Sequence, residues 1–353
     1  MFRAKLFLAL KVFPAGLCLV LAFASCATGG AAAFVPTAAP RPEWVSDLSG
    51  YRSARPTHLV ATGTGNSRHN AEMDALRQLV MIFGTDIQVD SRLVESYREV
   101  VRSGVVASWE DTAFDRTVAL EAGMDNLIGV EIGDFWTDGR THFALATMNR
   151  ASTVRIYSEM IRANREIIDN LTNMTPAERN TFDGFSRYRF AAMIADMNVS
   201  YGAVLSVMGA PQQGIRRGED FRRGAMEIAA AIPIAINVSN DRAGRLQGAF
   251  AGAFTDLGFR TGGTGRRYVL DVDVTVQPTD HAGQNVFVRM ELSANLIDTW
   301  TGAVLLPFTF NLREGHRTQA EAENRAFLEA ERRINNLYGA LLSDYLSRLV
   351  PRR

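Results

Sequence analysis

One cysteine stands where its thiol can be chemically modified. Cys26 follows the small residues Ala24 and Ser25, which end an apolar run over residues 12–23. Three basic side chains precede that run, and no acidic residue occurs before Cys26. A basic start, an apolar stretch and small residues at a cleavage point are the parts of a secretory signal. The pattern therefore predicts a bacterial lipobox, with cleavage before Cys26 and diacylation of the new N-terminal thiol.

The lengths of the flanking segments agree with this interpretation. About a dozen apolar residues are fewer than the roughly 20 that a permanent transmembrane helix needs, which favours cleavage. Residues 1–25 are then the signal peptide, and residues 26–41 form a flexible, lipidated tether rich in small residues. Two acyl chains give stable attachment where one gives only marginal binding, so membrane lipid is the predicted partner. An ordinary signal cut near Ala24 or near residues 31–33, with Cys26 incidental, remains the alternative.

Other residues whose spacing suggests chemistry have plainer explanations. Asp271 and Asp273 alternate along a predicted strand and share one side of it, which suits a metal or acid–base pair. An ordinary solvent-facing strand has the same spacing, and no third carboxylate or histidine is close in sequence. His142 is interpreted as a structural histidine in a strand, and the five histidines show no metal-ligand spacing. We therefore predict no catalytic residue, no metal, no cofactor and no enzymatic activity.

A glycine-rich segment follows the first predicted strand. Gly63 and Gly65 precede a helix, as in a dinucleotide-binding turn, but His69 occupies the place of the third glycine of that fingerprint. No parallel strand–helix–strand pattern follows. We interpret the segment as a tight turn that leads into the start of a helix.

Composition limits the kinds of partner. The chain has 353 residues with 38 basic and 38 acidic side chains. The first 25 residues hold three of the basic groups, so 35 basic and 38 acidic groups remain after cleavage. This near balance argues against nucleic-acid binding, which favours a strongly basic face. No second apolar run is expected to reach the length of a membrane span.

The first predicted domain covers residues 42–150. A strand over 58–62 leads to a helix over 71–83, whose apolar residues recur on one face. Candidate strands follow over 86–101 and 112–120. Residues 127–136 and 141–148 then indicate a hairpin that turns at Asp138-Gly139.

This region resembles a known family. The residues that carry the resemblance are Pro42-Glu-Trp-Val45, the run from Ala61-Thr-Gly63 to Ser67, and the helix motif Ala71-Glu72-x-x-Ala75. They resemble the LPP20 family of bacterial outer-membrane lipoproteins over about residues 42–150, under a third of the chain. The resemblance implies a small α/β domain, a lipid-anchored envelope location and no known catalytic residues. Some members of that family are parts of flagellar basal disks.

The rest of the chain is predicted to form a connector and a second domain. Residues 151–212 indicate a helical connector with helices over 151–173 and 176–208. In the second domain, residues 213–353, a helix over 216–232 and a strand over 234–238 come first, followed by a helix from Asn240 to Leu257. Alternating residues then predict a three-stranded meander over 268–276, 286–296 and 304–312. A long amphipathic helix over 319–349 ends the chain.

Together these patterns predict an α+β protein. Two small domains, each a mostly antiparallel sheet packed with helices, are joined by the helical connector. The expected function is a non-catalytic structural or assembly role at the outer membrane, lipid-anchored and facing the periplasm, since Ala27 rather than Asp follows Cys26. Partners would be envelope or flagellar assembly proteins, or a second copy paired along an exposed strand edge. A periplasmic module that binds peptidoglycan or another envelope compound, or a flagellar basal-body component, remains the alternative.

Overall fold

The computed structural model describes residues 40–83, 127–241, 244–263, 266–282 and 285–349. Helices and two sheets make up these residues, so the predicted α+β class is confirmed. The described residues from Arg41 onward belong to one compact unit. The candidate strands over 86–101 and 112–120, the signal segment and Cys26 lie outside the described residues.

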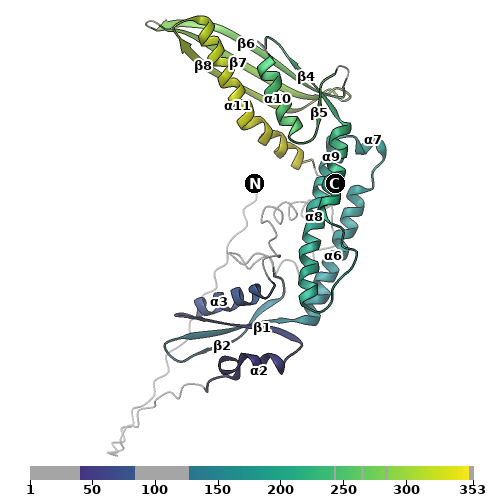
Figure 1. Ribbon diagram of the computed structural model, residues 1–353, viewed down its shortest axis with the longest axis vertical. Coiled ribbons are helices and arrows are strands. Elements are labelled where there is room, and N and C mark those ends of the chain that lie inside the picture. The colour runs from purple at the N-terminus through teal and green to yellow at the C-terminus, as the bar shows by residue number, and fades with distance from the viewer. Residues whose placement is uncertain (1–39, 84–126, 242–243, 264–265, 283–284, 350–353) are drawn as a thin grey trace, which may run out of the picture. The chain divides into compact units, whose positions relative to one another are not determined.

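The first sheet has three antiparallel strands in the order β1-β3-β2 (Figure 1). The predicted hairpin at Asp138-Gly139 is confirmed as the β2–β3 connection. Helix α3 covers one face of this sheet, and the small core of Trp44, Val60 and Leu145 covers the other, with α1 and α2 beside it. The bounds are β1 His58–Gly65, β2 Val130–Thr137, β3 His142–Asn149, α1 Glu43–Ser46, α2 Leu48–Ser53 and α3 Arg68–Met81.

The glycine segment holds α3 against β1. A Cβ atom placed on Gly63 would overlap the backbone of Ala71 and Ala75, and one on Gly65 would lie 2.6 Å from the backbone nitrogen of Ala71. Ala71 and Ala75 are fully buried. The glycines and alanines therefore allow a strand and a helix to approach at backbone distance, and this packing accounts for the motif without a nucleotide.

Four helices follow the first sheet. They are α6 Arg150–Thr172, α7 Pro176–Arg179, α8 Phe182–Val207 and α9 Gly218–Ala231. The predicted capping box at Thr175 and Glu178 is confirmed, but the helix expected over 176–208 is interrupted. Thr181 is a second N-cap, accepting a hydrogen bond from the Gly184 backbone. A Cβ on Gly184 would overlap the Arg179 carbonyl, so this glycine permits the tight corner between α7 and α8.

Helix α8 corrects another expectation. Within the described residues it is long and apolar enough to cross a membrane by length and composition, so the prediction that no second run reaches that length was wrong. Most of its apolar window is buried inside the protein, where α8 packs against α6 and α9. A helix that is apolar on nearly all sides is also what the core of a large protein requires.

The second sheet has the order β5-β4-β6-β7-β8 (Figure 1). Strands β6, β7 and β8 form the predicted antiparallel meander, while β4 pairs in parallel with both β5 and β6. Helices α10 and α11 pack on one face. The bounds are β4 Pro233–Val238, β5 Arg260–Thr261, β6 Tyr268–Ala282, β7 Asn285–Asp298, β8 Ala303–His316, α10 Arg245–Thr255 and α11 Gln319–Ser347.

Helix α10 begins later than predicted. Asn240 and Gly244 both have positive φ angles, of 57° and 65°, so neither residue has the α-helical backbone conformation. Asp241 instead caps the helix from outside, because its carboxylate accepts hydrogen bonds from the Leu246 and Gln247 backbone nitrogens at 3.3 and 2.9 Å.

Helix α8 belongs to two hydrophobic cores. Phe182 and Phe185, at its start, are buried in the core under the second sheet. From Phe190 onward its buried residues join the core formed by α6 and the first sheet. Helix α9 is shared in the same way, with Phe221 in one core and Ile228 in the other. The predicted connector is thus part of both cores.

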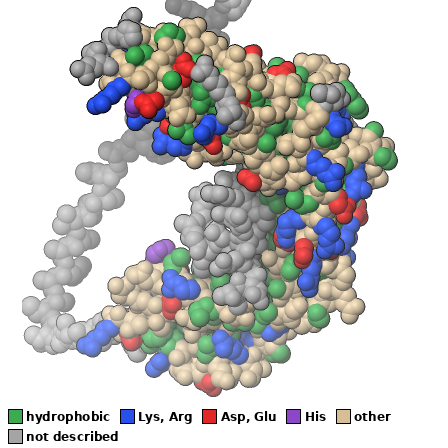
Figure 2. Space-filling view, turned by 45° about the horizontal axis from the view of Figure 1, so that its top comes forward, with side chains coloured by type: hydrophobic (Ala, Val, Ile, Leu, Met, Phe, Trp, Pro, Cys, Tyr) green, Lys and Arg blue, Asp and Glu red, His purple; other side chains and the backbone are tan. Residues whose placement is uncertain are grey.

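Charged side chains are mixed on the surface. On the face shown in Figure 2, Arg side chains lie interspersed with Asp and Glu. Many arginines pair with carboxylates, as Arg222 does with Asp196 at 2.6 Å and Arg216 with Asp169 at 2.6 Å.

Candidate functional site

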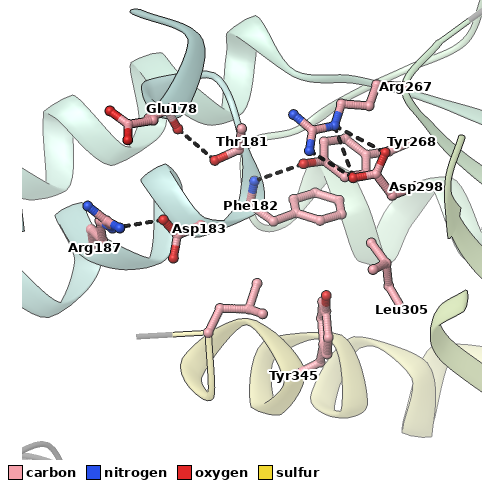
Figure 3. Close-up of a pocket in the computed structure, with 11 residues that line it drawn as sticks. Glu178, Thr181, Phe182, Asp183, Arg187, Arg267, Tyr268, Asp298, Leu305 and Tyr345 are labelled. Atoms are coloured by element: carbon pink, nitrogen blue, oxygen red, sulfur yellow. Dashed lines mark hydrogen bonds and ion pairs between the residues drawn. The ribbon is translucent and has the colours of Figure 1, made fainter. Parts of the chain in front are cut away.

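A pocket of about 330 Å³ lies where the α7–α8 corner meets the second sheet and the end of α11 (Figure 3). Its volume is at the lower end of the range for small-molecule sites. The lining combines ion-paired side chains, aromatic rings and two leucines. The lining residues are Glu178, Thr181, Phe182, Asp183, Arg187, Arg267, Tyr268, Asp298, Leu305, Tyr345 and Leu349.

An arginine–carboxylate pair forms one wall. Arg267, just before β6, donates from Nε and Nη2 to Asp298, at the end of β7, at 2.8–3.2 Å. The two positions meet because Tyr268, the first residue of β6, pairs with Asp298 in the antiparallel register. The Asp298 side chain is 7% exposed and that of Arg267 is 25% exposed.

The electrostatics of this pair favour its charged form. Burial acts to raise the pKa of the Asp298 carboxyl, but hydrogen bonds from Arg267 and from the Trp300 backbone outweigh it and hold that pKa below its ordinary value. The bond to Asp298 in turn raises the pKa of the Arg267 guanidinium. Both groups therefore stay ionised at neutral pH.

Aromatic rings surround the Arg267 guanidinium. Its Cζ lies 5.0 Å from the centroid of Tyr268 and 4.6 Å from that of Trp300, within the range of cation–π attraction. Trp300 sits in the β7–β8 turn and is 76% exposed. An exposed indole thus stands beside the wall of the pocket.

The start of α8 forms a second wall. The Phe182 backbone N–H, the first of the helix, donates to the Tyr268 hydroxyl at 3.4 Å, and the two rings stack at 3.9 Å. Thr181 accepts from the Gly184 N–H at 3.0 Å. Asp183, in the first turn, contacts Arg187 at 2.8 Å. The helix terminus is therefore capped, and a carboxylate already offsets its dipole.

Tyr345 reaches the pocket from α11. Figure 3 shows its hydroxyl directed toward Asp298 and Tyr268. Burial, with smaller contributions from Tyr268 and Asp298, raises the pKa of Tyr345 to about 12. Burial also raises the pKa of Tyr268. Both hydroxyls are thus protonated and able to donate as well as accept hydrogen bonds.

The candidate site residues predicted from the sequence do not line this pocket. Asp271 and Asp273 lie on the exposed face of β6, where their carboxylates accept hydrogen bonds from Asn237 at 2.8 Å and Ser239 at 3.2 Å. They fasten β4 and the turn after it to β6. Among the described residues, no group of three or more His, Cys, Asp or Glu side chains is placed to hold a metal ion.

His142 lies far along the chain from these carboxylates, on β3. Its ring stacks on Phe135 at 5.6 Å, and it pairs with Gly65 in the sheet register. Its Nδ1 is buried without a hydrogen-bond partner in the described part of the chain. The structure thus places His142 in the first sheet and does not bring it together with Asp271 or Asp273.

Sequence reasoning missed the pocket. Arg267 and Asp298 lie just outside the strands predicted over 268–276 and 286–296, and Tyr345 lies within the helix predicted over 319–349, so no pattern marks them as a site. The available signal was the register, because an antiparallel pairing of the two predicted strands places position 268 opposite 298. Contacts between the start of α8 and β6 depend on tertiary packing and leave no local pattern.

Comparisons with known proteins complete the description. No family model matches the chain, and no curated protein matches it. Similar solved structures include a secreted protein of Helicobacter pylori, 13% identical with a TM-score of 0.40, covering 80% of this chain and 98% of that one. A minor lipoprotein of Acinetobacter baumannii is 16% identical with a TM-score of 0.25, covering 34% of this chain and 93% of its own. Rare lipoprotein B of Shewanella oneidensis is 10% identical with a TM-score of 0.24, covering 33% and 95%. At these identities and scores the matches add no argument about function.

Proposed function

We propose that this protein is a lipid-anchored, non-catalytic component of the bacterial cell envelope. Its acylated Cys26 holds it to the outer membrane, and the folded body faces the periplasm, where it has a structural or assembly role. The observation that carries the proposal is the sequence around Cys26: a basic start, a short apolar run and two small residues directly before the thiol. The resemblance of residues 42–150 to LPP20 lipoproteins points the same way.

The start of the folded body suits attachment through a tether. The compact unit begins at Arg41, at the end of the small-residue segment that follows Cys26. Three residues later the Trp44 side chain is buried, and its Nε1 donates to Asp134 of β2 at 2.9 Å. A coil of about 15 residues has an r.m.s. reach of roughly 20 Å, enough to hold a folded body clear of lipid headgroups.

The charged groups of the pocket support a non-catalytic role. A general acid or base works best with a pKa near the working pH. Here the pKa of Asp298 moves down, while those of Arg267, Tyr268 and Tyr345 move up. Every shift is away from neutrality, so these groups serve as fixed charges and hydrogen-bonding groups.

A cysteine substitution tests the anchor. In full-length chain expressed in a diderm bacterium, Cys26→Ser removes the thiol that lipid would modify. We expect the precursor to stop responding to globomycin, an inhibitor of lipoprotein signal cleavage, and the protein to leave the detergent phase in Triton X-114 partitioning. Wild-type protein should sediment with outer-membrane fractions in a sucrose gradient.

The second cysteine supplies the matched control. Cys18 lies inside the apolar run, so Cys18→Ser makes the same chemical change without touching the modified position. It should process and partition like wild type. If Cys26→Ser also behaves like wild type, the lipid anchor does not exist. Anchored protein in inner-membrane fractions would keep the anchor and contradict the outer-membrane location.

A further inference from the structure

We infer that the pocket at the α7–α8 corner binds a neutral saccharide unit. Four of the groups with a shifted pKa in the described residues line this one pocket: Arg267, Tyr268, Asp298 and Tyr345. Concave sites that gather such groups are the default candidates for ligand binding. The inference is independent of the membrane anchor.

The charges of the lining are already compensated. Arg267 is paired with Asp298, and Arg187 with Asp183. The Glu178 carboxylate accepts from the Thr175 backbone nitrogen at 2.9 Å and from its hydroxyl at 2.8 Å. A charged ligand would have to break one of these pairs and leave its partner uncompensated, which is costly away from water. A neutral ligand leaves every pair intact.

The helix terminus at the pocket does not offer an anion site. The first backbone donor of α8, at Phe182, is taken by the Tyr268 hydroxyl, and the Gly184 donor is taken by Thr181. Asp183 adds a negative charge in the same turn. A phosphate or carboxylate would therefore meet occupied donors and a like charge.

The remaining polar groups match alcohols. The Tyr345 hydroxyl has no hydrogen-bond partner among the described residues, and Figure 3 shows it directed into the pocket. The Tyr268 hydroxyl accepts from Phe182 and keeps its own proton for donation. An ion-paired carboxylate such as Asp298, 7% exposed, still has lone pairs to offer. Groups that both donate and accept are what a ring bearing several hydroxyls requires.

Apolar surface completes the match. Leu305 and Leu349 line the pocket, and the exposed Trp300 indole stands beside it on Arg267. A sugar ring carries hydroxyls at its edge and C–H groups on its faces, so it needs both kinds of surface together. Trp, Tyr and Arg are the side chains enriched among those that dominate binding energy at protein interfaces, and all three types occur at this pocket.

Titration of saccharides into the purified full-length protein tests this inference. The protein is kept in lauryldimethylamine oxide micelles, a detergent without a sugar headgroup, and binding is followed by calorimetry and by saturation-transfer NMR of the ligand. The neutral probes are maltose and N,N′-diacetylchitobiose, and glucose 6-phosphate is the anionic comparison. We expect at least one neutral probe to bind with a Kd below about 1 mM.

Two variants and a control localise the binding. Tyr345→Phe removes one hydroxyl and keeps the ring, so it should weaken binding about five-fold, the effect of one lost hydrogen bond. Leu305→Arg places a long cation in the pocket and should abolish binding. Tyr51→Phe removes a hydroxyl on α2, away from the pocket, and should leave the Kd unchanged. Circular dichroism melts of each variant establish that it is folded.

Three results would overturn the inference. They are the absence of binding by either neutral probe up to about 10 mM, binding of glucose 6-phosphate as tight as that of the neutral probes, and neutral-probe binding that both pocket variants retain at full strength. None of these results changes whether Cys26 is acylated, so this inference and the proposed anchor fail separately.

Discussion

At the scale of single residues, two buried tyrosines differ in the hydrogen bonding of their hydroxyl groups. The Tyr157 hydroxyl accepts a hydrogen bond from the Ile128 backbone nitrogen at 2.8 Å. The Tyr338 hydroxyl is buried with no hydrogen-bond partner in the described part of the chain. Its ring packs against Phe250 and Phe308 at 4.8 and 5.4 Å. A buried polar group without a hydrogen-bond partner lowers the free energy of unfolding, whereas a hydrogen-bonded one raises it.

We therefore expect Tyr338→Phe to stabilise the protein. Removing the unpaired hydroxyl should raise the free energy of unfolding by about 1 kcal/mol, while Tyr157→Phe should lower it by about 1–3 kcal/mol because the Ile128 donor loses its partner. Urea unfolding at neutral pH measures both. Equal destabilisation by the two substitutions would show that Tyr338 has a buried partner.

The same pair of variants tests how the free energy of unfolding depends on pH. Burial raises the pKa of both tyrosines. Below the ordinary tyrosine pKa of about 10 the folded and unfolded chains are both protonated, so neither tyrosine makes the free energy of unfolding depend on pH. Above about pH 10 that free energy falls as the pH rises, because the unfolded chain then loses a proton that the folded protein retains. The alkaline decline should be shallower in Tyr338→Phe than in wild type.

At the scale of elements, the periodicity of apolar residues predicted most helices and strands. Local helix caps explain the helix boundaries that it did not predict. The alternating residues of β6, β7 and β8 identified the meander because one face of that sheet is buried and the other is wet. The break at Thr181 was not predicted because the capping box at Thr175 and Glu178 already marks a helix start six residues earlier. Its local signal was the Thr181-Phe-Asp-Gly184 run, an N-cap with an acidic residue in the first turn. The parallel pairing of β4 depends on tertiary packing and has no such signal.

The contact between β1 and α3 gives an element-scale prediction. Gly63→Ala would place a methyl group into the α3 backbone at Ala71 and Ala75, so the helix must move away from the strand. Overpacking of this kind costs about 1–3 kcal/mol, and more where backbone rather than a side chain must give way. Thermal unfolding should show a lower Tm.

Gly248 is the matched control for that substitution. It lies inside α10 with open space around it, so Gly248→Ala meets no atom and gains helix propensity. It should stabilise the protein by up to about 1 kcal/mol. A Gly63→Ala protein as stable as wild type would contradict the close approach of β1 and α3.

At the scale of the whole molecule, the two cores are joined by continuous helices. Because α8 and α9 each contribute buried residues to both cores, neither core can lose its packing without exposing part of a helix that the other needs. The sequence predicted a connector between two domains. Helical periodicity shows that one face of a helix is buried, but it does not show which elements pack against that face.

Scanning calorimetry should accordingly show one cooperative transition. Phe185→Ala leaves a cavity in the core under the second sheet, and Ile194→Ala leaves one in the core beside the first sheet. Each should lower the stability of that same transition by about 2–5 kcal/mol. Separate transitions, with each variant shifting only one, would show instead that the cores unfold independently.

The buried Trp44 determines how the folded body would carry mechanical load. A pull on the N-terminal end reaches the indole only three residues into the compact unit, and from there it passes through the Trp44–Asp134 bond to strand β2. Trp44 lies within α1 and before α2, so a force applied at the N-terminal end would act on a sheet before it could unwind α2.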